Sequence, residues 1–103
     1  MNHWHRKEKL FDNQIITIGD ASKIIRWGSY SFCNLSILSN KDESYSILFK
    51  NDVDSDWLEF DKIDVQKDNH LQYRFSQICG TFFRLRKILG ENSEADIFLE
   101  LKN

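Results

Sequence analysis

The stretch that decides the fold runs from residue 70 to residue 102 and reads HLQYRFSQICGTFFRLRKILGENSEADIFLELK. Apolar residues recur at every second position, as at Leu71, Tyr73 and Phe75, and polar residues fill most positions between them. Two further runs later in the stretch repeat this pattern. A period of two indicates a β-strand with one face on a core. Three such runs separated by turn residues predict an antiparallel meander, in which each strand pairs with the next.

The rest of the chain continues the pattern of short apolar runs between turn residues. Gly, Asn, Asp and Ser supply the turns, because the sequence contains no proline. The sequence therefore predicts an all-β fold, a single antiparallel β-sandwich of about eight short strands of the Ig-like or jelly-roll type. The expected strands cover residues 14–18, 22–27, 30–39, 45–50, 57–63, 70–76, 81–89 and 95–102.

The length of 103 residues predicts one domain that can bury a core without a metal or a disulfide. We expect residues 1–12 to form an N-terminal arm and residues 13–103 to form the sandwich. The arm holds Trp4 and Phe11 among polar residues. Because terminal segments are poorly ordered unless something holds them, these aromatic side chains predict a contact with the domain body or with a neighbouring subunit.

The composition argues against several classes of partner. The formal net charge is −2, which opposes bulk binding of nucleic acid. Alternation also places Tyr73 and Phe75 on the face opposite Arg74, so no nucleic-acid partner is expected. No apolar run approaches the roughly 20 residues of a membrane-spanning helix. The first ten residues lack the apolar segment of a secretory signal, so neither a membrane partner nor a signal peptide is expected.

The charge is unevenly distributed along the chain. Residues 41–68 carry four basic and nine acidic side chains, whereas the next 22 residues carry four basic side chains and no acidic one. In a meander, Arg84 and Arg86 would pair with Asp96 and Glu100 on a neighbouring strand. The alternative is a bipolar surface, acidic in one part and basic in another, that docks head to tail with copies or partners.

The segment Asp52-Val-Asp-Ser-Asp56 is the nearest approach to a ligand-binding motif. Carboxylates at Asp52, Asp54 and Asp56 suggest a calcium loop, but such a loop needs Gly at its sixth place and Glu at its twelfth. Trp57 and Ile63 stand there instead. An acidic hairpin tip that keeps a sheet edge soluble is the better interpretation.

Other patterns that carry chemistry are missing from the sequence. His3 and His5 lack further ligands at metal-site spacing. Neither a G-x-S-x-G elbow nor a phosphate-binding glycine loop is present. Cys33 and Cys79 are interpreted as two buried thiols or as one cross-sheet disulfide. We therefore expect no metal, no cofactor, no catalytic residue and no enzymatic activity.

Aromatic residues near strand ends keep a glycan in view as a partner. Trp27, Tyr30 and Trp57 lie close to the ends of predicted strands, where a carbohydrate-binding sandwich exposes its aromatic platforms. This hypothesis requires Trp27 or Trp57 to be exposed to solvent.

Three segments resemble the small β-sandwich accessory modules of tailed-phage virions. They read SFCNLSIL at residues 31–38, DWLEF at residues 56–60 and GTFFRLR at residues 80–86. They follow the rhythm strand, turn, W-x-x-l, strand, G-x-[YF]-[YF]-R-[VL]-R of such domains. The resemblance implies a structural role in head, neck or tail, in a homo-oligomer or with other virion proteins, and a location in the virion or the cytoplasm. It carries over no catalytic residues.

Together these observations predict a non-enzymatic structural or assembly protein that acts through protein–protein contacts. A carbohydrate-binding β-sandwich module and a small acidic inhibitor of a host or phage enzyme are the alternatives. The residues expected to make the contacts are Trp4, Phe11, Arg84, Arg86, Asp52, Asp54 and Asp56.

Overall fold

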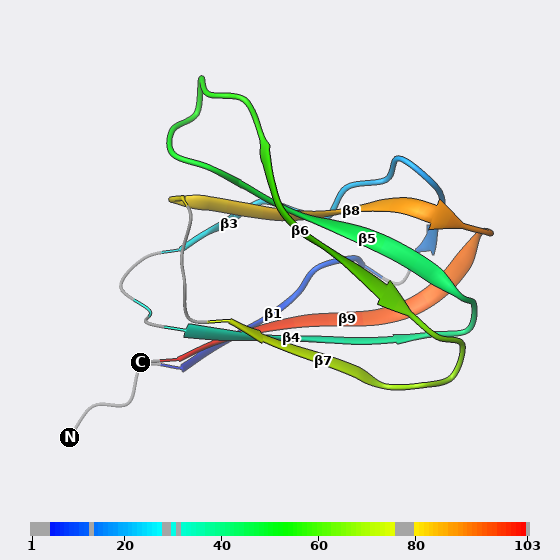
Figure 1. Cartoon of the computed structure of the whole chain (residues 1–103). Helices are drawn as coiled ribbons and strands as arrows, with labels where there is room; N and C mark the ends of the chain where they lie inside the picture. The colour runs from blue at the N-terminus through cyan, green and yellow to red at the C-terminus, as the bar shows by residue number, and fades with distance from the viewer. Residues whose placement is uncertain (1–4, 13, 28–29, 31, 76–79, 103) are drawn as a thin grey trace.

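The protein forms nine β-strands in two antiparallel sheets that pack face to face (Figure 1). The computed structural model describes residues 5–12, 14–27, 30, 32–75 and 80–102. These residues include no helix of the length and apolar character needed to cross a membrane. The two packed antiparallel sheets confirm the predicted all-β sandwich. Its strands are β1 (His5–Lys9), β2 (Ile15–Ile16), β3 (Ile25–Arg26), β4 (Phe32–Ser39), β5 (Glu43–Lys50), β6 (Leu58–Val65), β7 (Leu71–Phe75), β8 (Phe82–Gly90) and β9 (Ser93–Lys102).

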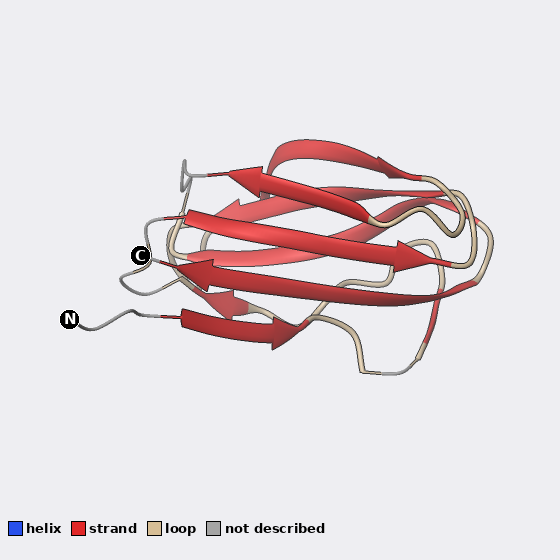
Figure 2. Ribbon diagram, turned by 90° about the horizontal axis from the view of Figure 1, so that it is seen from below, coloured by secondary structure: helices blue, strands red, loops and turns tan. Residues whose placement is uncertain are grey.

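The strand order is that of one long hairpin wound over itself. The five-stranded sheet has the order β1-β9-β4-β7, with β2 also on β9, and the four-stranded sheet has the order β3-β8-β5-β6. Each antiparallel pair brackets the one before it, from β5–β6 through β4–β7 and β3–β8 to β1–β9, and successive pairs alternate between the two sheets. Figure 2 shows long strands lying side by side in the two layers. This nesting defines a jelly roll.

The predicted meander of the last three strands is wrong. Strands β7 and β9 both pair with β4 in one sheet, whereas β8 pairs with β3 and β5 in the other. The chain crosses between the sheets at Gly90, where φ is +116° and a Cβ atom would lie 2.7 Å from the carbonyl oxygen of Asp42. Alternation of apolar residues identifies the buried face of each strand, but it does not identify the partner strand.

The predicted N-terminal arm is a strand over residues 5–9. Strand β1 pairs with β9 along its length, from His5 opposite Lys102 to Lys9 opposite Phe98. The next two residues, Leu10 and Phe11, are buried in the core. This part of the chain therefore docks on the domain body. Trp4 lies outside the described residues.

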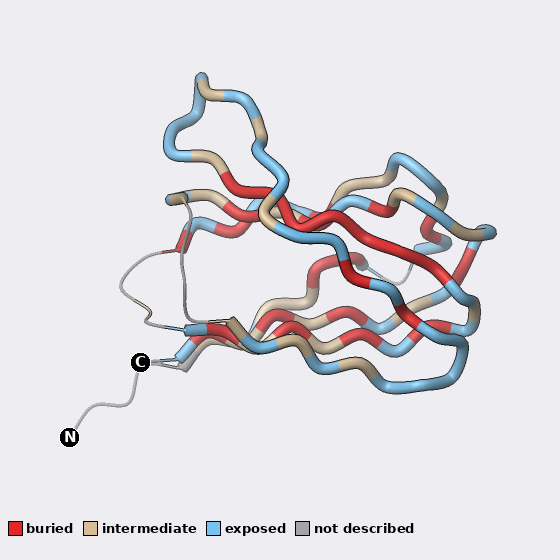
Figure 3. The backbone as a smooth tube through the Cα atoms, viewed as in Figure 1, coloured by how far each residue is buried: buried red, intermediate tan, exposed pale blue. Residues whose placement is uncertain are grey.

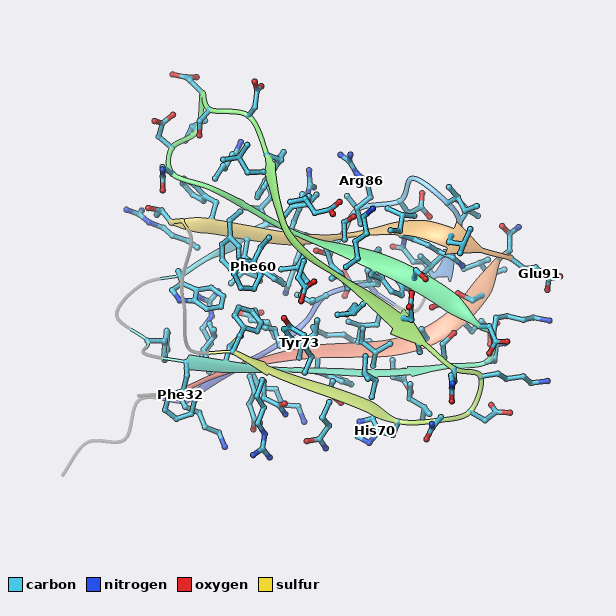
Figure 4. The ribbon with its side chains drawn as sticks, viewed as in Figure 1. Phe32, Phe60, His70, Tyr73, Arg86 and Glu91 are labelled. Carbon is cyan, nitrogen blue, oxygen red and sulfur yellow. The ribbon has the colours of Figure 1, made fainter. Side chains whose placement is uncertain are left out.

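Two kinds of side-chain contact close the sides of the sandwich. On the β1–β3 side, the Glu8 carboxylate on β1 accepts hydrogen bonds from the Nζ of Lys23 at 2.8 Å and from the Nε of Arg6 at 2.7 Å. On the β6–β7 side, the Tyr73 hydroxyl donates to an Asp61 carboxylate oxygen at 2.5 Å. Figure 4 shows Tyr73 between the two layers at this side.

The aromatic residues gather at one end of the core. Trp27 is 2% exposed, and its ring centroid lies 5.6 Å from Phe49, 5.9 Å from Phe75 and 5.8 Å from Phe83. Figure 3 shows buried segments of both sheets facing each other across the layers. Rings from both sheets thus fill the space between them, and such burial is the main source of stability in a domain of this size.

Candidate interaction surface

The outer face of the four-stranded sheet carries the predicted arginines. On β8 the inward positions belong to Phe83, Leu85 and Lys87, which are all buried, so Arg84 and Arg86 point outward. Figure 4 shows Arg86 projecting away from the other sheet. Their neighbours on β5 are Leu48 and Ser46, respectively. The predicted pairing with Asp96 and Glu100 is wrong, because those residues lie on β9 in the other sheet.

Positive charge dominates this outer face. We call its five outward cations, Arg26, Lys50, Lys62, Arg84 and Arg86, the basic face. Their positions follow from the register, because Arg26 and Lys50 both lie opposite Phe82, and Lys62 lies opposite Ser46. The guanidinium group of Arg86 makes no hydrogen bond or ion pair with any other described residue, which leaves it available to a partner.

Arg84 is held in place, whereas Arg86 is free. The Nε and Nη2 of Arg84 donate to the carbonyl oxygen of Ser22 at 3.2 Å and 3.0 Å. Its guanidinium carbon lies 5.3 Å from the ring centroid of Trp57, and the Nζ of Lys50 lies 4.7 Å from the same centroid. Partial burial, together with the charge of Arg86, lowers the pKa of Arg84 from its ordinary value. Two cations therefore contact Trp57, an arrangement that stabilises a half-buried indole.

The segment between β5 and β6 is an acidic hairpin tip, as predicted. We call residues 51–57 the acidic loop. Its backbone is held by short-range bonds: the Ser55 hydroxyl donates to the Asp52 carbonyl at 2.9 Å, and the Asp54 amide donates to an Asp52 carboxylate oxygen at 3.0 Å. The Nζ of Lys50 donates to the carbonyl of Val53 at 3.1 Å. Asp52, Asp54 and Asp56 are exposed, so the loop presents carboxylates in a defined conformation.

The acidic loop and the basic face adjoin each other. Lys50 closes β5 and lies opposite Phe82 at the start of β8, and Trp57 leads from the loop into β6. Figure 1 shows the loop rising beyond the four-stranded sheet on its outer side. The structure thus brings the predicted arginines and aspartates to one side of the molecule, although they are far apart in sequence.

Phe11 is not a surface contact residue. It is 3% exposed and belongs to the core, with its ring centroid 6.4 Å from that of Tyr45. Trp27 is buried as well, so it cannot be the exposed platform that the glycan hypothesis requires. Cys33 is a buried free thiol whose pKa is raised by burial, as the two-thiol interpretation expected, and Cys79 lies outside the described residues.

A buried polar cluster at the other end of the core escaped the sequence analysis. Lys87 and Glu43 are both buried, and the Lys87 Nζ lies 2.9 Å from a Glu43 carboxylate oxygen. The same ammonium group donates to the Ile16 carbonyl at 3.0 Å, to the Ser93 hydroxyl at 3.0 Å and to the carbonyl of Glu91. Its charge is therefore fully compensated inside the protein.

Tyr45 completes this cluster from the next inward position of β5. Its hydroxyl donates to the second Glu43 carboxylate oxygen at 2.5 Å. Burial, reinforced by the Glu43 carboxylate, raises the pKa of Tyr45 far above its ordinary value. Lys87 shares the parity of Phe83 and Leu85 in the sequence, and an inward lysine of this kind is the signal that could have revealed the cluster.

The remaining polar features lie at the ends and on the opposite face. An open depression of about 560 Å³ is lined by three acidic residues, Asp68, Glu94 and Asp96, and by neighbouring residues that include Leu38 and Ala95. Nowhere in the described ranges do three His, Cys, Asp or Glu side chains gather to hold a metal ion. On the outer face of the five-stranded sheet, His70 Nε2 lies 2.5 Å from the hydroxyl of Ser36 (Figure 4).

Comparison with known proteins identifies a shared fold. No protein-family model matches the sequence, and a comparison with curated proteins gives no match. Among solved structures, the coat protein of Tobacco streak virus aligns over 99% of this chain and 87% of that chain, with a TM-score of 0.51 and 9% sequence identity. An identity this low shows a similar arrangement of strands and leaves function to be argued from the surface.

Proposed function

We propose that the protein is a non-enzymatic structural protein of a virus particle and that it assembles through protein–protein contacts. The observation that carries this proposal is the likeness of nearly the whole chain to a viral coat protein. Jelly-roll sandwiches are a recurrent architecture of capsid proteins, although the fold also serves lectins and other proteins. The charged outer face beside a protruding acidic loop supports a role in presenting surfaces to partners.

A more specific assignment follows from the resemblance of three sequence segments to tailed-phage accessory modules. Residues 31–38 lie largely in β4, residues 56–60 lead into β6 and residues 80–86 lead through β8, so the segments belong to the framework of both sheets. On this basis we assign the protein to the head decoration, neck or tail of a phage particle, where copies of itself or other virion proteins are its partners.

A glycan-binding role has less support. Trp27 is buried, and the half-buried ring of Trp57 is contacted by Lys50 and Arg84. Neither ring is the open platform on which a sugar stacks. Trp4, which lies outside the described residues, stays a predicted contact residue.

The mass of the purified protein in solution tests the proposal. Light scattering coupled to gel filtration, at protein concentrations from roughly 1 to 500 µM, is expected to show a homo-oligomer that dissociates on dilution. A monomer throughout this range would refute self-assembly as its function. In that case an isolated binding module is the better description.

A further inference from the structure

The basic face holds more positive charge than its own chain compensates. Its five cations share the face with two carboxylates, Glu59 and Asp64. Both are engaged: Glu59 accepts a hydrogen bond from Ser46 at 2.9 Å, and Asp64 accepts one from Ser44 at 2.5 Å. Since the whole chain has a formal net charge of −2, this face is set apart from the rest of the molecule.

The acidic loop lies at one end of this face, whereas Arg86 lies about halfway along it (Figure 4). Lys50 anchors the loop beside Phe82, whereas Arg86 pairs with Ala21, and the turn at Gly19 bonds the carbonyl of Lys87. Arg86 is four positions beyond Phe82 along β8, a distance of about 13 Å and near the middle of the strand. The loop therefore projects carboxylates at one end of the face, while an arginine about halfway along the face stays unpaired.

We propose that this face docks on the same face of a second copy. The two copies are related by a two-fold axis that lies between their facing four-stranded sheets and runs across the strands. When this axis passes midway between the loop and Arg86, it exchanges their positions, so the acidic loop of each copy covers Arg86 of the other. Asp52, Asp54 and Asp56 then supply the missing carboxylates. Val53, which is 74% exposed at the loop, approaches Ile18, which is 60% exposed in the turn beside Lys87.

A second copy fits this surface better than nucleic acid does. The carboxylates of the loop repel a polyanion from the neighbouring cations, whereas a second copy brings equal numbers of both charges. The three long strands β5, β6 and β8, about 4.8 Å apart and about 26 Å long, present roughly 400 Å² per copy, below the roughly 800 Å² of a stable complex. The contact is therefore weak, depends on concentration and weakens with salt.

Charge reversal tests this contact. The contact rests on the proposed self-assembly and specifies a second copy as the partner and the basic face as the docking surface. Arg86→Glu and Asp54→Lys are each expected to raise the dimer dissociation constant at least tenfold, because each change acts twice across a two-fold axis. The double variant Arg86→Glu/Asp54→Lys restores attraction and is expected to recover most of the affinity. Sedimentation equilibrium gives the constants, and circular dichroism verifies that each variant is folded.

Arg74→Glu is the matched control, because Arg74 is an exposed arginine on β7 in the other sheet. An unchanged dissociation constant in this variant supports the proposal, and an equal loss in it overturns the proposal. If Arg86→Glu or Asp54→Lys forms the oligomer as tightly as the wild-type protein does, this contact is overturned but self-assembly is not. Binding of a fluorescent single-stranded oligonucleotide that is lost in Arg86→Glu would assign the face to nucleic acid instead.

Discussion

Removal of the Lys87 ammonium group is expected to destabilise the protein more than any surface change of charge. Lys87→Met leaves the buried Glu43 carboxylate without its cation and removes the donor to the Ile16 and Glu91 carbonyls. Breaking a buried ion pair from one side costs about 3–5 kcal/mol. A domain of this size has a total stability of about 5–15 kcal/mol, so the variant loses a large fraction of it.

Urea unfolding, monitored by circular dichroism, measures this loss of stability. In a separate thermal unfolding experiment, the midpoint temperature should fall by more than about 10 °C. Adding Glu43→Gln to Lys87→Met removes the orphaned charge and keeps an acceptor for the Tyr45 hydroxyl. The double variant is therefore expected to be more stable than Lys87→Met alone, by about 1 kcal/mol or more.

Lys62→Met is the control, because the Lys62 side chain is 64% exposed and lies 3.8 Å from Glu59. Its effect should stay within about 0.5 kcal/mol. The reasoning is refuted if Lys87→Met lowers the free energy of unfolding by less than about 1 kcal/mol. It is also refuted if Glu43→Gln lowers that free energy further in the Lys87→Met background, because the two charges would then not depend on each other.

Three further predictions concern the residues that join the sheets. Phe11→Ala should cost about 3–5 kcal/mol in urea unfolding, because Phe11 belongs to the core; a change below about 1 kcal/mol would return it to the surface. Hydrogen bonds from Lys23 and Arg6 lower the pKa of Glu8 below its ordinary 4.5, so this carboxylate stabilises the fold above that pH. Glu8→Gln should therefore reduce stability by up to about 1 kcal/mol near neutral pH, and the difference should vanish as the pH falls through the lowered pKa; a difference independent of pH contradicts this. The hydrogen bond to Asp61, with burial, raises the pKa of Tyr73 to about 12, which adds stability below pH 10 that is lost as the pH rises through 12. Asp61→Asn should shift the tyrosinate absorbance of Tyr73 to lower pH, with Tyr73→Phe as the blank, and an unshifted titration would show that Asp61 has no influence.

The buried faces of the strands could be predicted from the sequence, but the pairing of the strands could not. Phe83 and Leu85 point inward, as their alternation with polar residues indicates. Leu89 shares their parity and yet is 63% exposed, because the register between β5 and β8 shifts between Ser44 and Tyr45. A bulge of this kind reverses the facing of every later residue and leaves no clear mark in the sequence.

The N-terminal strand was hidden by its composition. Its inward positions are Arg6 and Glu8, which pair with each other and with Lys23 rather than entering the apolar core. An alternation of charged residues therefore resembles a solvated arm. Position in space, and not the sequence pattern, determines that these residues close one side of the sandwich.

The candidate surface was predicted in its parts. The acidic loop and the outward arginines were identified from residue types and alternation, whereas their shared location depends on β5 pairing with both β6 and β8. Only one member of the buried ion pair could be predicted. The inward position of Lys87 indicated that it needs an acidic partner, but Glu43 lies before the predicted strand at residues 45–50. Nothing local distinguished it from the many other acidic residues.

The position of β9 also sets the order in which the molecule can be built. This strand is the last of the nine to be synthesised, and β1, β2 and β4 all pair with it. Before β9 is present, β1 and β2 have no strand to pair with, and a loop nearly as long as the domain must close before the β1–β9 contacts form. Strand β4 can pair with β7 earlier, but β1 and β2 have no partner strand until β9 has been synthesised. Nascent protein therefore carries exposed strand edges that invite premature association.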